Sequence, residues 1–216
     1  KMLGGCSSHN GMVFVRGNPL DFERWASYDL PKWSYKNVLP YFKKLENWSG
    51  GENVYRGGNG PLKVNRSKIN EKYPLFQSVL NAASEAGFKL FEDCNGNSQE
   101  GFGTFDVTIN NGKRQGVGRA YLDEVKNKRN LKIFTNSNVL KIIFENKKAI
   151  GIEVNKNNRI EKYFANKEIL LSAGSINSPK LLQLSGIGNA NHLKNLNIDI
   201  VHDLPGVGQN LQDHLE

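Results

Sequence analysis

A glycine-rich segment near the start of the chain combines a permissive backbone with polar and nucleophilic side chains. Two glycines, a thiol, two hydroxyls and an imidazole follow one another in Gly4, Gly5, Cys6, Ser7, Ser8 and His9. Adjacent glycines let backbone amides approach a bulky ligand closely, and a neutral imidazole is a nucleophile near physiological pH. Taken alone, the segment predicts either a loop that contacts a ligand or a tight turn without one.

A second glycine-containing segment lies in the other half of the chain. The run 168–171, which is apolar from Ile169 to Leu171, leads into Ala173 and Gly174. Ser178 and Pro179 suit the cap and first turn of a helix reaching residue 184. We expect the run to be a strand buried in a parallel sheet. A strand, a glycine turn and a helix N-terminus make an anion-binding arrangement, although a plain capped helix has the same pattern.

Hydrophobic periodicity predicts the elements that must position these segments. We expect helices over 34–48, 74–86, 117–125 and 178–184, and strands over 131–135, 139–144, 149–154, 160–164, 168–171 and 199–201. Turns at 145–147 and 156–158 separate the middle strands, which therefore form an antiparallel meander. The fold class is α/β with α+β character.

Composition excludes several classes of protein. The net charge is +8, from 29 Lys and Arg against 21 Asp and Glu, but the cations are scattered and no nucleic-acid-binding module is present. No apolar run approaches the roughly 20 residues that span a bilayer. The two cysteines, Cys6 and Cys94, have no metal-site spacing and indicate free thiols in a reducing compartment, although one bridge between them is the alternative.

The two motifs together resemble the glucose-methanol-choline (GMC) family of flavin-dependent oxidoreductases. The first motif covers 3–17 and continues into 18–25, the second covers 174–188, and a third block at 204–214 is also similar to the family. Further blocks at 30–44 and 57–62 are similar to choline dehydrogenase-like members. The resemblance covers essentially the whole chain.

The resemblance implies a partial FAD-binding domain of the Rossmann-like type that carries an antiparallel β-meander. Its parts would be a flavin-contact loop at 1–30, a helical and loop insert at 31–110, and the meander with the second motif at 111–216. Family members begin with a βαβ unit whose glycine turn holds the FAD pyrophosphate, and end with a substrate domain that carries a catalytic histidine. We expect both to lie outside this chain, which then holds no catalytic residue and no metal site.

The resemblance also assigns cofactor-binding residues. The loop against the flavin and its phosphates is matched by Gly4, Gly5, Cys6 and Ser7. The segment along the isoalloxazine ring is matched by Asn10, Gly11, Met12 and Val13. Val139 matches a strand whose backbone contacts adenine, although a plain core residue is the alternative, and Ala173 and Gly174 match the turn near the ADP half.

Position 9 departs from the commonest family pattern. His9 resembles the histidine that some members, among them choline-oxidising ones, bond covalently to the flavin. The alternative is a histidine that only packs beside the ring. Because the family places FAD against this loop, both alternatives imply FAD as the cofactor.

The implied activity is the oxidation of a small-molecule alcohol, choline-like or another primary alcohol, to an aldehyde by hydride transfer to flavin. The electrons would pass to oxygen, or to a quinone or other carrier. The location would be cytoplasmic, either free or peripheral at the inner membrane. A hydroxynitrile lyase of the same fold and a non-catalytic basic binding module are the rival functions.

We predict that purified residues 1–216 alone bind FAD poorly and do not oxidise alcohols. The physical reason is that the family's pyrophosphate-binding turn and catalytic histidine fall outside this sequence. Absorbance after desalting measures retained FAD, and a stoichiometric amount would contradict the prediction.

Overall fold

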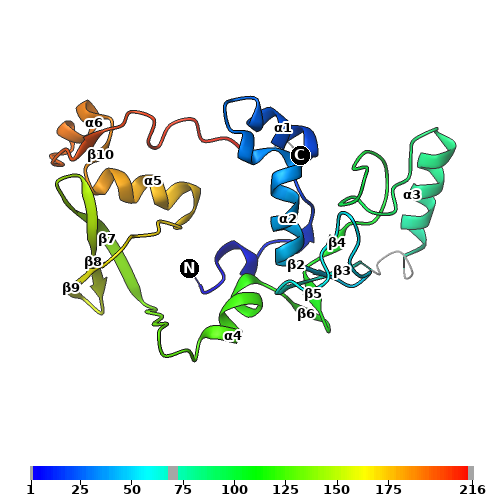
Figure 1. The fold of residues 1–216 in the computed structure, drawn as a ribbon, viewed down its shortest axis with the longest axis horizontal. Helices are drawn as coiled ribbons and strands as arrows, with labels where there is room; N and C mark the ends of the chain where they lie inside the picture. The colour runs from blue at the N-terminus through cyan, green and yellow to red at the C-terminus, as the bar shows by residue number, and fades with distance from the viewer. Residues whose placement is uncertain (1, 68–72, 214–216) are drawn as a thin grey trace. The chain divides into compact units, whose positions relative to one another are not determined.

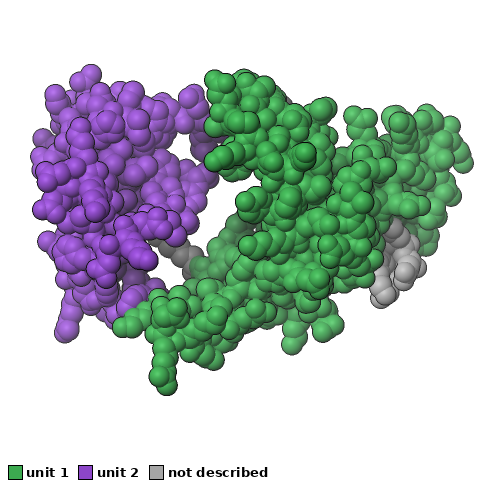
Figure 2. All heavy atoms as spheres, in the orientation of Figure 1, with its two compact units in different colours: residues 1–132 green, residues 133–216 purple. Residues whose placement is uncertain are grey.

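The computed structural model describes residues 2–67 and 73–213, and the chain divides into two compact units (Figures 1 and 2). Unit 1 is residues 1–132 and unit 2 is residues 133–216. Both units combine short helices with small sheets, which confirms the mixed α/β class. Among the described residues, every helix is too short or too polar to serve as a membrane span.

Unit 1 is organised around a four-stranded sheet with the strand order β1-β4-β3-β2. The strands are β1 (Val13–Phe14), β2 (Glu46–Trp48), β3 (Leu62–Arg66) and β4 (Asp106–Val107). β2 and β3 run parallel, whereas β4 is antiparallel to both β1 and β3. β1 directly follows the first glycine-rich segment, so the sheet fixes where that segment leaves the core.

Three helices and two short helical turns complete the first two thirds of unit 1. The helices are α1 (Pro19–Ala26), α2 (Tyr35–Leu45) and α3 (Pro74–Glu85), and the 3-10 turns are η1 (Gly5–Ser8) and η2 (Pro31–Trp33). Asn18 caps α1 by accepting the Leu20 N–H at 2.9 Å, with Pro19 in the first turn. α3 ends as predicted, at a glycine with positive φ, Gly87.

The last part of unit 1 is a hairpin followed by a helical turn. The hairpin pairs β5 (Ile109–Asn110) with β6 (Lys113–Arg114), and its loop residues Asn111 and Gly112 both have positive φ. An Asn-Gly pair with positive φ at both residues is the two-residue connection that matches strand twist best. The predicted helix 117–125 is present as a π-helical turn, η4 (Gly118–Leu122), and one α-helical turn, α4 (Asp123–Val125).

A cluster of buried charges holds the sheet of unit 1 together. We call it the ion cluster: Arg16, Glu46, Arg56, Arg66, Asp93 and Asp106. The Arg56 guanidinium contacts Glu46 at 2.6 Å, Asp93 at 2.7 Å and Asp106 at 2.8 Å, and it stacks 4.2 Å from the Trp48 ring. The cluster therefore connects β2, β4 and the connection that carries Arg56.

The positive and negative charges of the ion cluster balance, which offsets the cost of burying them. The cluster contains three guanidinium groups and three carboxylates, and the side chains of Glu46, Arg56 and Asp106 are fully buried. Burial disfavours the charge on Arg56, but hydrogen bonds to Glu46 and Asp93 outweigh that effect, so the pKa of Arg56 lies above its ordinary value. The predicted helix 34–48 ends at Leu45 because Glu46, the first residue of β2, is drawn into this cluster.

Unit 2 contains the predicted meander. β7 (Ser137–Glu145), β8 (Lys148–Lys156) and β9 (Arg159–Phe164) form an antiparallel sheet in chain order, with turns at the two predicted places. α5 (Gly174–Leu184) packs on β7, where the Ser185 hydroxyl accepts the Ile142 N–H at 2.8 Å. α6 (Ala190–Asn195) lies between β10 (Ile187–Gly188) and β11 (His202–Asp203), which pair in parallel.

Three predicted strands and the predicted start of α5 are wrong. Residues 131–135 and 168–171 are not strands, because a strand needs a neighbour to pair with and the described residues offer none there. Leu170 is accordingly 81% exposed. The strand predicted at 199–201 lies instead at 202–203, where it pairs with β10. α5 begins at Gly174 rather than at Ser178, because the Ser178 hydroxyl accepts the Ala173 N–H one turn earlier.

We predict that Arg56→Met lowers the free energy of unfolding by about 3–5 kcal/mol, because it leaves buried carboxylates without their partner. Urea unfolding measures this loss. The control is Lys126→Met in the exposed Asp123–Lys126 pair, expected to change stability by less than about 0.5 kcal/mol. Equal losses in the two variants would contradict the prediction.

Candidate functional site

The backbone of the first glycine-rich segment is folded by its own hydroxyl groups. Gly4 and Gly5 have φ of 88° and 54°, a region that favours glycine. The Ser7 hydroxyl donates to the Gly4 carbonyl at 2.5 Å and accepts the Val117 N–H at 2.9 Å, and the Ser8 hydroxyl donates to the Leu3 carbonyl at 2.7 Å. Both hydroxyls therefore shape the loop.

The opposite side of this loop is open. Cys6, His9, Asn10 and Gly11 are exposed, and a Cβ at Gly5 or Gly11 would meet no atom within 4 Å. The N–H groups of His9 and Asn10 both donate to the Cys6 carbonyl, which closes the turn. The structure gives the His9 imidazole no hydrogen bond to any described residue. The loop thus presents a thiol, an imidazole and bare backbone on one side.

The strand that follows the loop alternates between exposed and buried side chains. Val13 and Val15 are 55% and 48% exposed, whereas Arg16 is buried in the ion cluster. The Arg16 N–H also donates to the Asn95 side chain at 2.8 Å. Since successive strand residues point to opposite faces, the anchoring of Arg16 turns the two valines outward. Met12 adopts a positive φ of 64° between the loop and this strand.

A residue that the sequence analysis missed holds the loop in place. The Arg114 guanidinium donates from Nη1 to the Asn10 carbonyl at 2.7 Å, to the Asn10 Oδ1 at 2.8 Å and to the Ser7 carbonyl at 3.3 Å. The Thr108 N–H donates to the Met12 carbonyl at 2.8 Å, so the β5–β6 hairpin is tied to the loop twice. The signal for this hairpin was present in the sequence as Asn111–Gly112.

The sequence-predicted residues of unit 2 lie on neighbouring elements. Val139 is half-buried in β7 opposite Val154, as a core strand residue would be. Ala173 and Gly174 are exposed at the start of α5, where Gly174 has a φ of 90°. The structure therefore gathers residues 4–13 into one surface of unit 1, and places the other three predicted residues in unit 2.

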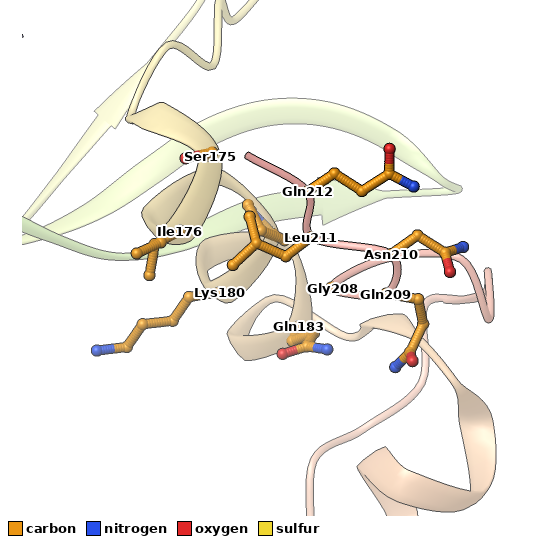
Figure 3. Close-up of a pocket in the computed structure, with 10 residues that line it drawn as sticks. Ser175, Ile176, Lys180, Gln183, Gly208, Gln209, Asn210, Leu211 and Gln212 are labelled. Atoms are coloured by element: carbon orange, nitrogen blue, oxygen red, sulfur yellow. The ribbon is translucent and has the colours of Figure 1, made fainter. Parts of the chain in front are cut away.

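Unit 2 also contains an open pocket of about 420 Å³ between α5 and the segment 208–212 (Figure 3). Its lining is Ser175, Ile176, Pro179, Lys180, Gln183, Gly208, Gln209, Asn210, Leu211 and Gln212. The Lys180 side chain extends away from the segment 208–212 in Figure 3. The other polar side chains that line the pocket are amides and one hydroxyl. A pocket lined in this way can hydrogen-bond a ligand but has no acid–base pair for catalysis.

Three of the four histidines and both cysteines lie within the described residues. His192 is exposed on α6 and His202 lies within β11, whereas His214 falls outside the described residues. Within 2–67 and 73–213 no group of three His, Cys, Asp or Glu side chains is placed to hold a metal ion. Both cysteines are free, with Cys6 exposed and Cys94 buried.

Comparison with known proteins adds to this geometry. Residues 1–216 match the family described as GMC oxidoreductase. The oxygen-dependent choline dehydrogenase of Brucella ovis is 49% identical over 216 residues, which are 100% of this chain and 39% of that protein. The chain thus spans 39% of the length of this relative.

Two solved structures resemble the chain closely. The pyridoxine 4-oxidase from Mesorbium loti has a TM-score of 0.90 at 30% identity, over 96% of this chain and 41% of that one. An FAD-dependent oxidoreductase from Chaetomium thermophilum has a TM-score of 0.89 at 35% identity, over 96% of this chain and 38% of that one. The chain therefore belongs to the GMC oxidoreductase family, whose members bind FAD, and has the mixed α/β fold of that family's FAD-binding domain.

Proposed function

We propose that this chain is the FAD-binding part of an enzyme that oxidises a small primary alcohol such as choline. The observation that carries the proposal is the open loop at residues 4–11, with its exposed imidazole, in a chain of this family. The similarity to choline dehydrogenase supports the choice of substrate class.

The residues of the loop and of β1 fit a flavin. Gly5 and Gly11 leave open space where a Cβ would stand, so a flat ring can lie directly against the backbone. Val13 and Val15 add exposed apolar side chains beside the polar loop. A cofactor that carries an apolar ring and a polar phosphate chain needs both kinds of surface.

The residues of this chain would bind and orient the cofactor. We assign the flavin to Gly4, Gly5, Cys6, Ser7, His9, Asn10, Gly11, Met12 and Val13, and the ADP half to Val139, Ala173 and Gly174. When bound, FAD accepts a hydride from the carbon that bears the substrate hydroxyl. The base that takes the hydroxyl proton would come from the substrate domain of the full-length protein, and the electrons would pass to oxygen, or to a quinone or other carrier.

His9 has a specific part in this proposal. Its imidazole is exposed and has no described hydrogen-bond partner, so a ring nitrogen is available to bond the edge of the flavin or to pack beside it. A covalent bond would prevent loss of the cofactor. The free thiols of Cys6 and Cys94 suit the reducing, cytoplasmic location that we propose.

We predict that the full-length protein is purified with FAD and that choline or another primary alcohol bleaches the flavin under anaerobic conditions. Flavin that stays oxidised with every alcohol would point instead to a lyase of the same fold. After acid precipitation, colour that stays with the protein, and a flavin adduct on the peptide containing His9, would establish the covalent form. His9→Ala is expected to abolish the adduct, whereas the matched control His192→Ala, on an exposed helix, leaves it intact.

We also predict that FAD protects Cys6 from alkylation. Iodoacetamide should modify Cys6 in protein stripped of FAD, because its thiol is exposed on the loop. Burial, with the nearby Asp106 and Asp93 carboxylates, raises the pKa of the Cys94 thiol, so Cys94 should react only after unfolding. Peptide mass spectrometry measures both thiols. A Cys6 that reacts equally fast with and without FAD would place the cofactor elsewhere.

A further inference from the structure

The orientation of His9 depends on the backbone around it. The structure shows no hydrogen bond from its imidazole to any described residue, and the residue is exposed. Its backbone sits at the end of the 3-10 turn η1, with φ −141° and ψ −4°. A side chain with no partner of its own samples the staggered rotamers that its backbone allows. Whatever fixes the backbone from residue 7 to residue 10 therefore fixes the Cβ of His9 and the region that its imidazole can reach.

One guanidinium group contacts the backbone on both sides of His9. Arg114 Nη1 donates to the Ser7 carbonyl, which precedes His9, and to the carbonyl and Oδ1 of Asn10, which follows it. The Asn10 Oδ1 also accepts the Met12 N–H at 3.2 Å. A donor that carries a charge makes stronger hydrogen bonds than a neutral donor. The three acceptors are thereby held around a single nitrogen.

The hairpin that carries Arg114 is itself well fixed. Arg114 pairs with Ile109 across β5 and β6, and the Gln115 N–H donates to the Thr108 carbonyl at 2.8 Å. Val117, which lies beyond the hairpin, donates its N–H to the Ser7 hydroxyl at 2.9 Å. The guanidinium is thus presented from a hairpin that is bonded to the loop on either side of it.

Arg114 forms no ion pair with the carboxylates of the described residues. Within residues 2–67 and 73–213 the carboxylates that pair with arginine side chains contact Arg16, Arg24, Arg56 and Arg66. Arg114 is half-buried, and its side-chain hydrogen bonds to described residues all go to the loop. Ion pairing therefore does not explain its place in the structure, whereas its contacts with the loop do.

We propose that Arg114 is a positioning residue: it holds the backbone on both sides of His9 so that the imidazole is presented to the flavin. This inference rests on the proposed function, because it presumes that FAD binds at the loop. Arg114 acts through Ser7 and Asn10. Neighbouring Lys113 offers a matched control, since it is exposed and adjacent strand residues point to opposite faces.

The test uses the full-length protein with Arg114→Ala, Arg114→Lys and Lys113→Ala. Hydrogen–deuterium exchange of peptides covering residues 4–13 measures how well the loop is ordered, independently of activity. The flavin retained on prolonged dialysis, and the fraction that stays with the protein in acid, measure how well the cofactor is held. In Arg114→Ala we expect faster exchange at the His9 and Asn10 amides and about tenfold weaker flavin retention, from the loss of charged hydrogen bonds. Lys113→Ala removes the same charge and should match wild type. Arg114→Lys should be intermediate, because an ammonium group keeps the charge but not the planar geometry.

Asn10→Ala provides a second route to the same contact. It removes one acceptor of Arg114 and should weaken flavin retention, and the double variant with Arg114→Ala should lose less than the sum of the two single losses. Additive losses would overturn the proposal. An Arg114→Ala protein that matches Lys113→Ala in loop exchange and in flavin retention would also overturn it. The same holds for an Arg114→Ala protein in which the loop exchange changes but the flavin retention does not. A wild-type protein that never holds flavin would overturn the proposed function and with it the positioning role, whatever the loop exchange.

Discussion

Arg56 is completely buried and contacts three carboxylates, and the rest of unit 1 depends on this contact. A buried guanidinium is tolerated only where its charge is balanced and its hydrogen bonds are made. The ion pairs of the Arg56 guanidinium bring together Glu46 at the start of β2 and Asp106 in β4. Arg16, which follows β1, joins the same cluster through Glu46 at 2.5 Å. The ion pair of Arg16 and the backbone pairing of β1 with β4 therefore set the position of β1 together, and the loop before β1 is held against the sheet.

The two sides of the loop have different roles. On one side, hydroxyls and backbone groups bond to each other, to the β5–β6 hairpin and to Val117. On the other side, glycine backbone, a thiol and an imidazole remain exposed. A surface whose inner groups are all used and whose outer groups are free is preorganised for a ligand, since little ordering is left to occur on binding. This is the property that the proposed flavin site requires.

Unit 2 uses a different kind of framework. Its three-stranded sheet has ordinary apolar burial, with Val154 and Ile142 in the core, and the buried hydroxyl of Ser185 joins α5 to β7. Several apolar side chains remain exposed, namely Phe164, Leu170, Ile176 and Leu211. Two of these side chains, Ile176 and Leu211, line the pocket of this unit, whose polar groups are suited to hydrogen bonding.

The sequence by itself determined the features that depend on neighbours along the chain: the meander turns at Asn146 and Asn157, the end of α3 before Gly87, and the motifs that identify the family. Tertiary structure decided the features that depend on distant partners. Arg56 stands in a polar, glycine-rich connection and looks like a surface residue until Glu46, Asp93 and Asp106 surround it. Arg114 meets Asn10 across 104 positions of sequence. The apolar run 168–171 fails to become a strand for the same reason, because pairing needs a partner that local pattern does not supply.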